Sequence, residues 1–188
     1  RSTLERSSAA SDVYKRQAKG TTTLKNCAVE PEIKDLTNFL NLAGAKITWS
    51  GRKCKIIGVE SLNKTEYSVM PDRIEAGTFC VASCLNGGKL KIKNFEPKII
   101  NTEINLLKKI GAKIKTTKNT IQISGPKKIR SLDFLKTGEY PNFPTDLQAQ
   151  IMVLLTKADG KSTIEENIFE NRFMPVSYTH LRAHETQD

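Results

Sequence analysis

The chain has 188 residues, of which 38% are hydrophobic and 27% charged, and no stretch approaches the roughly 20 consecutive apolar residues of a membrane span. Its polar, charged N-terminus lacks the apolar core of a signal peptide, so we expect a protein of the cytoplasm with no membrane partner. The formal net charge of +10 would suit nucleic-acid binding. The lysines are scattered, however, and aromatic residues, which could stack on bases, make up only 6% of the chain. Nucleic-acid binding is therefore only an alternative, and no nucleic-acid partner is predicted.

The two ends of the chain differ from the sequence between them. Residues 1–17 and 175–188 carry no apolar period and resemble translated adapter read-through, so we expect two non-native-looking tails outside the fold. The only histidines, His180 and His184, fall in the second tail and are not candidates for catalysis. The cysteines contain no Cys-x-x-Cys pair, so we expect neither a metal site nor a cofactor, and reduced thiols at all four positions: Cys27, Cys54, Cys80 and Cys84.

The first predicted unit, residues 18–70, combines one helix with three strands. The helix is predicted to begin at residues 30–32, around Pro31, and to end at Gly44. Its apolar stripe has helical spacing and consists of Ile33, Leu36, Leu40 and Ala43. The strands are predicted at residues 22–25, 46–49 and 55–57, the last two joined through Gly51.

The order of this unit recurs with a period near 67 residues. The segment FLNLAGAKI at 39–47 returns as LLKKIGAKI at 106–114, which places Gly44 and Gly111 at equivalent positions. The second copy predicts a helix through Ile100, Ile104 and Leu107, followed by a hairpin of strands at 113–116 and 120–124.

Two further helices, at residues 72–86 and 146–157, are apolar on nearly every side. Such helices are buried in the folded protein. A strand predicted around residues 163–164 indicates that a third copy begins there. The pattern therefore predicts an α/β (α+β) fold in which buried helices are covered by sheets and outer helices.

Three segments carry a resemblance to a known family: PDRIEAGTF at 71–79, FPTDLQAQ at 143–150 and ENIFENRFM at 166–174. In this order they resemble the enolpyruvyl transferases, and most closely the branch that acts on UDP-N-acetylglucosamine. The resemblance implies an inside-out α/β barrel built from repeated βαβαββ units and incomplete here. Residues 18–70 are then the last unit of one domain, and residues 71–174 the first part of a second.

The resemblance also implies an activity. Members of this branch transfer the enolpyruvyl group of phosphoenolpyruvate to the 3-hydroxyl of UDP-N-acetylglucosamine, the first committed step of peptidoglycan synthesis. The branch acting on 3-phosphoshikimate shares the fold but not the three segments, and it is the alternative. Oligomeric state is not indicated.

Asp146 is the candidate catalytic residue. It follows Pro141 and Pro144 at the start of an apolar helix, so its carboxylate is expected to be held in place. On residue type alone, Asp146 or Thr145 fits a helix cap as well. The resemblance implies instead that Asp146 binds the sugar hydroxyl and acts as general base.

Three more residues are candidate ligands of the substrate. By resemblance Ile168 contacts the nucleotide sugar, although an isoleucine is also an ordinary core residue. Arg172 suits a carboxylate or phosphate, or else a structural ion pair. By resemblance Tyr140 approaches the nucleotide, or else it is a surface aromatic residue. Asp72 is predicted to be the N-cap of the helix at 72–86. Arg73 and Glu75 are charges in the first turn of that helix, and they are candidates only for supporting the residues that contact the substrate.

Part of the family's machinery has no counterpart in this sequence. None of the four cysteines matches the family's proton-donating loop cysteine, and the family's phosphate-gripping lysine and arginines have no match either. We therefore expect no turnover from these residues alone.

Overall fold

The structure is a computed structural model that describes residues 19–169. The two expected tails, Arg172 and both histidines lie outside these residues. The chain divides into two compact units, with unit 1 ending at Met70 and unit 2 beginning at Pro71. Between residues 19 and 169 no helix has the length and apolar character needed to cross a membrane.

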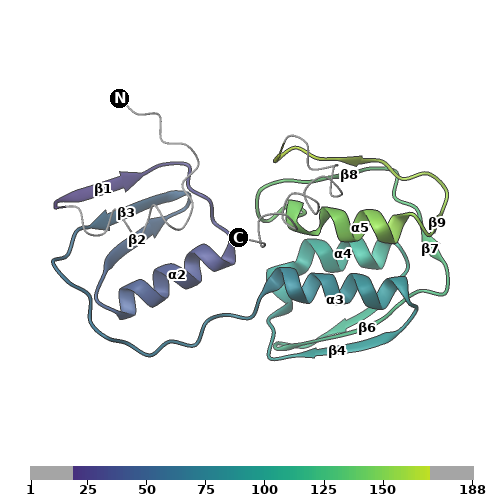
Figure 1. The fold of residues 1–188 in the computed structure, drawn as a ribbon, viewed down its shortest axis with the longest axis horizontal. Helices are drawn as coiled ribbons and strands as arrows, with labels where there is room; N and C mark the ends of the chain where they lie inside the picture. The colour runs from purple at the N-terminus through teal and green to yellow at the C-terminus, as the bar shows by residue number, and fades with distance from the viewer. Residues whose placement is uncertain (1–18, 170–188) are drawn as a thin grey trace, which may run out of the picture. The chain divides into compact units, whose positions relative to one another are not determined.

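Unit 1 is a three-stranded antiparallel sheet with one helix against it (Figure 1). The sheet order is β1-β3-β2, so the last strand of the unit is central. Its elements in chain order are β1 (Thr21–Leu24), α2 (Pro31–Leu42), β2 (Lys46–Ser50) and β3 (Lys53–Ile57). The core between helix and sheet is formed by Leu24, Leu40, Ala45, Ile47, Cys54 and Ile56.

Local sequence explains how α2 is joined to its sheet. Pro31 occupies the first turn, where its missing N–H costs no helical hydrogen bond. Gly44 follows the helix with a φ of +102°, a conformation that glycine adopts without strain, so the predicted end of the helix is confirmed. The Asn41 side chain then accepts from the Ile47 N–H at 2.9 Å and donates to the Ile47 carbonyl at 2.8 Å, which ties β2 to the helix end.

Unit 2 begins with a helix and repeats the arrangement of unit 1. Its three-stranded sheet has the order β4-β6-β5 with every pair antiparallel. This order matches the order β1-β3-β2 of unit 1. The predicted internal repeat is therefore confirmed in topology. The elements are α3 (Arg73–Leu85), β4 (Lys89–Lys93), η1 (Pro97–Ile100), α4 (Asn101–Lys109), β5 (Lys113–Thr116) and β6 (Thr120–Ser124).

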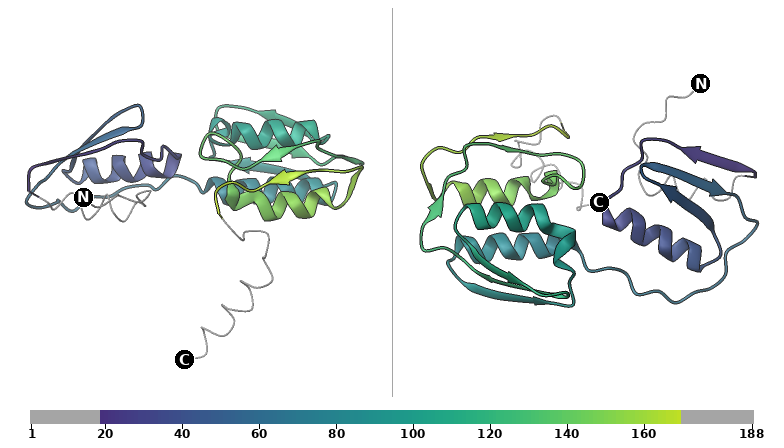
Figure 2. Two further views of the ribbon diagram at one scale, coloured as in Figure 1. Left: turned by 90° about the horizontal axis from the view of Figure 1, so that it is seen from above. Right: turned by 180° about the vertical axis from the view of Figure 1, so that it is seen from behind.

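The rest of unit 2 adds a third helix and two short parallel pairs of strands, β7 with β9 and β8 with β10. Figures 1 and 2 show α3, α4 and α5 side by side, and α3 contacts both of the others. The elements are β7 (Ile129–Arg130), β8 (Leu135–Lys136), η2 (Thr145–Leu147), α5 (Gln148–Leu155), β9 (Ala158–Asp159) and β10 (Ile164–Glu165).

Each of the two apolar helices is buried on most sides and exposed on one. Phe79 on α3 is 54% exposed and Val153 on α5 is 52% exposed, whereas Cys80 and Ile151 are fully buried. Within unit 2, α3 packs on α4, α5, β4 and β6, and these neighbours cover only part of its circumference. The helix predicted at 146–157 also starts differently, because residues 145–147 form a 3-10 turn before α5.

Two cysteines belong to the core of unit 2. Burial, with a smaller contribution from Glu103, raises the pKa of Cys80 to about 11; burial, with a contribution from Cys80, raises that of Cys84 to about 12. No disulfide involves any of the four cysteines.

This burial predicts selective thiol chemistry. At pH 8 in the native chain, iodoacetamide should alkylate half-buried Cys27 first. Cys80 and Cys84 should react more than about a hundredfold more slowly than an unhindered peptide thiol. Peptide mass spectrometry after timed quenching measures the three rates. In urea all sites should react at similar rates. Equal rates in the native chain would contradict the packing of α3.

Candidate active site

The loops that carry two of the candidate ligands meet at one edge of unit 2. Strands β8 and β10 run parallel, so the segments that leave their carboxyl ends lie next to each other. The N–H of Thr137, just after β8, donates to the Glu165 carbonyl at 3.0 Å. From that edge one segment continues to Tyr140, and the other continues to Ile168.

Asp146 lies in the turn η2, where its side chain is exposed. The N-cap positions of η2 and α5 are occupied by Pro144 and Leu147, and neither makes a side-chain cap. Thr145, the other residue considered as a cap, instead donates its hydroxyl to Glu166 at 2.8 Å. Asp146 is thus an exposed residue at the beginning of a well-packed helix.

Glu166 joins this turn to the segment that carries Ile168. One oxygen of its carboxylate accepts the Thr145 hydroxyl, and the other accepts the N–H groups of Ile168 at 2.7 Å and Phe169 at 3.2 Å. Burial alone would raise the pKa of Glu166, but the hydrogen bonds from Ile168, Thr145, Thr137 and Phe169 together lower it below its ordinary value. The carboxylate is therefore held in its charged form.

Tyr140 is supported from the neighbouring helices. The guanidinium carbon of Arg73, the first residue of α3, lies 5.7 Å from the centre of the Tyr140 ring. The Thr102 hydroxyl on α4 donates to the carbonyl of Pro141 at 2.6 Å. Arg73 is 6% exposed and lies near buried Glu103. Burial raises the pKa of Glu103, and the positive charge of Arg73 offsets only part of that rise.

The structure thus brings Asp146, Ile168 and Tyr140 to one edge of unit 2. Asp72 caps α3 as predicted, accepting from the Ile74 N–H at 2.7 Å. Sequence reasoning did not identify Glu166 or Glu103. The signal for Glu166 is its place three residues before Phe169 in a Glu-Asn-Ile-Phe turn, where a carboxylate can reach the following N–H groups.

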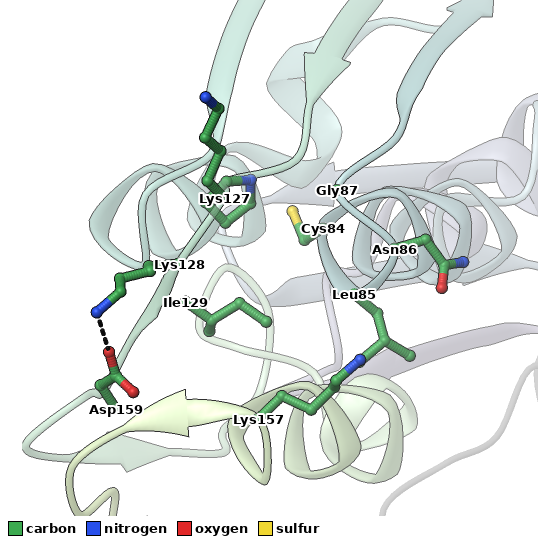
Figure 3. A pocket seen from close by; sticks show the side chains of 10 residues that line it. Cys84, Leu85, Asn86, Gly87, Lys127, Lys128, Ile129, Lys157 and Asp159 are labelled. Atoms are coloured by element: carbon green, nitrogen blue, oxygen red, sulfur yellow. Dashed lines mark ion pairs between the residues drawn. The ribbon is translucent and has the colours of Figure 1, made fainter.

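A pocket of about 330 Å³ lies at the other end of α3 and α5, at their C-termini (Figure 3). Lys127, Lys128 and Lys157 line it, and Lys128 forms an ion pair with Asp159 at 3.3 Å. Lysines are favourable there because the helix dipole is negative at its C-terminus. This basic pocket lies at the opposite end of α3 and α5 from the candidate site. In the described part of the chain no group of three or more His, Cys, Asp or Glu residues could hold a metal ion.

Comparisons with known proteins agree with this architecture. Residues 13–181 match the family described as EPSP synthase (3-phosphoshikimate 1-carboxyvinyltransferase). The chain therefore belongs to this family of enolpyruvyl transferases.

Curated relatives identify a branch of the family that this chain resembles. The UDP-N-acetylglucosamine 1-carboxyvinyltransferase of Pelagibacter ubique is 59% identical over 161 residues, which is 85% of this chain. The enzyme of the same name from Geotalea daltonii is 48% identical over 161 residues. The chain spans 38% of the length of each of these relatives.

Solved structures support the fold. The enolpyruvyl transferase NikO from Streptomyces tendae matches with a TM-score of 0.73 at 24% identity, over 88% of this chain and 40% of that one. EPSP synthase from Acinetobacter baumannii matches with a TM-score of 0.51 at 17% identity, over 78% of this chain and 35% of that one. The predicted enolpyruvyl transferase fold is confirmed, and it is present in part.

Proposed function

We propose that this chain is part of a cytoplasmic enzyme that transfers the enolpyruvyl group of phosphoenolpyruvate to the 3-hydroxyl of UDP-N-acetylglucosamine. This reaction is the first committed step of peptidoglycan synthesis. The observation that carries the proposal is the 59% identity, over 161 residues, to a relative named for this activity.

We propose Asp146 as the general base and as a ligand of the acceptor hydroxyl. Asp146 is exposed on a turn that is anchored to a helix, so it is accessible to a bound substrate. Proton removal accompanies attack of the hydroxyl oxygen on the central carbon of phosphoenolpyruvate, while a proton donor elsewhere in the enzyme protonates the methylene carbon. The resulting tetrahedral ketal then loses one methyl proton and phosphate, which restores the double bond.

The other candidates are proposed as binding residues. Ile168 contacts the nucleotide sugar, partly through its backbone, and Tyr140 approaches the nucleotide from the neighbouring segment. Arg172, which lies outside the described residues, is proposed to bind a phosphate or carboxylate group. Residues of the remaining length of the enzyme supply the proton donor and the groups that bind phosphoenolpyruvate.

A reaction on 3-phosphoshikimate is the second candidate, because the family description names that enzyme. The identities favour the first candidate. The EPSP synthase from Acinetobacter baumannii shares only 17% identity with this chain.

A chimera decides between the two acceptors. Residues 19–169 replace the matching segment of the Pelagibacter ubique relative, and phosphate release is measured with each acceptor. We expect turnover with UDP-N-acetylglucosamine and none above background with 3-phosphoshikimate. Turnover only with 3-phosphoshikimate, or with neither acceptor although the unaltered relative is active, would refute the proposed function.

A further inference from the structure

One carboxylate outside the set of candidate ligands connects two of them. Glu166 accepts the Thr145 hydroxyl at 2.8 Å, and Thr145 directly precedes Asp146. The same side chain accepts the Ile168 N–H at 2.7 Å and the Phe169 N–H at 3.2 Å.

A second contact supports the carboxylate from the side of β8. The Asn167 N–H donates to the Thr137 hydroxyl at 3.0 Å, and Thr137 is 1% exposed. Thr137 also contributes to lowering the pKa of the Glu166 carboxyl. The segment after β10 is therefore held at three consecutive residues, Asn167 to Phe169, by two side chains that are themselves held in place.

We infer that Glu166 is a positioning residue that sets the spacing between Asp146 and the backbone at Ile168, and thereby the affinity for the acceptor sugar. This inference rests on the proposed function. Hydrogen bonds to a charged acceptor are stronger and shorter than neutral ones, so a carboxylate holds both sides more firmly than a neutral group can. The effect of the carboxylate passes through the two segments that it joins.

The first test uses the 188-residue chain and requires no catalysis. Amide hydrogen exchange at Ile168 and Phe169 is followed by NMR in the unsubstituted chain and in Glu166→Ala. We expect exchange at both amides to accelerate at least about tenfold in Glu166→Ala, because each loses a charge-assisted bond. The control is Glu165→Ala, whose side chain is an exposed ion-pair partner of Lys136 at 2.8 Å and should leave both amides unchanged.

The second test measures kinetics in the chimera. Glu166→Ala should raise the KM for UDP-N-acetylglucosamine at least about tenfold and change the KM for phosphoenolpyruvate less than about twofold. Glu166→Gln keeps the shape and one neutral acceptor. Its KM for UDP-N-acetylglucosamine should therefore lie between the values of the unsubstituted chimera and of Glu166→Ala. A general loss of folding would instead reduce the active fraction and leave both KM values unchanged.

The outcomes separate this inference from the proposed function. Unchanged amide exchange in a folded Glu166→Ala chain overturns the inference, as does an unchanged acceptor KM. An unsubstituted chimera that is inactive with UDP-N-acetylglucosamine overturns the proposed function and the role in acceptor binding with it. Accelerated exchange together with a raised acceptor KM, graded from Glu to Gln to Ala, supports the inference.

Discussion

Replacing Asp146 by asparagine is expected to lower turnover of the chimera at least about a hundredfold, the typical contribution of a general base. Asparagine has nearly the same shape and can still accept a hydrogen bond from the acceptor hydroxyl, but it cannot take up the proton. Because the Asp146 side chain is exposed, the substitution should leave thermal stability nearly unchanged. Phosphate release at saturating substrates measures the effect.

A matched substitution at Asp133 controls for the loss of one negative charge. Asp133 is also exposed and belongs to the same unit, in the segment between β7 and β8. Asp133→Asn should keep turnover within about twofold of the unsubstituted chimera. If Asp146→Asn were as active as Asp133→Asn, Asp146 would not be the base.

Gly125→Ala is expected to destabilise unit 2 by about 3 kcal/mol. A Cβ at Gly125 would meet the Ser83 carbonyl oxygen and the Cα atoms of Cys84 and Gly87. These are backbone atoms at the end of α3, and they cannot rotate away as a side chain could. The free energy of unfolding from urea titration, followed by circular dichroism, measures the loss.

Gly88 provides the control for this prediction. It pairs with Gly125 through a 2.8 Å hydrogen bond from the Gly125 N–H to the Gly88 carbonyl, yet a Cβ at Gly88 would meet nothing within 4 Å. Gly88→Ala should therefore change the free energy of unfolding by less than about 1 kcal/mol. Equal effects of the two substitutions would show that the backbone at Gly125 lies farther from the end of α3 than it does in this structure.

The repeated topology could be predicted from sequence because each unit encodes it locally. Gly44 and Gly111 both adopt a positive φ just after a helix, at +102° and +114°, and the apolar residues of each helix recur at helical spacing. The hairpins alternate apolar and polar residues, so their register follows from the requirement that one face be buried. These signals lie within a few residues of each other and depend little on the rest of the fold.

The short parallel pairs could not be predicted. Each strand of β7-β9 and β8-β10 has two residues, too few to show an alternation. The partners are also distant in sequence, with Leu135 opposite Ile164. An apolar pattern also does not say how many neighbours a helix has, so the particular exposed residues, Phe79 and Val153, could not be predicted.

The candidate site was predictable only where a motif is continuous. The segments around Asp146 and Ile168 are short continuous motifs, and their roles remain proposals. The network that joins them depends on the carboxylate of Glu166 and on Thr145, which is 21 residues away. Helix statistics favoured Asp146 or Thr145 as a cap, but the Thr145 hydroxyl is used in this tertiary contact instead.

The structure of the product tests the central claim most directly. The chimera is incubated with phosphoenolpyruvate and UDP-N-acetylglucosamine, and the purified nucleotide sugar is examined by mass spectrometry and by NMR. Our account predicts one enolpyruvyl group, seen as two vinyl protons, joined through an ether at the 3-oxygen of the sugar. Attachment at another oxygen, or a vinyl ether formed only when 3-phosphoshikimate is the acceptor, would contradict it.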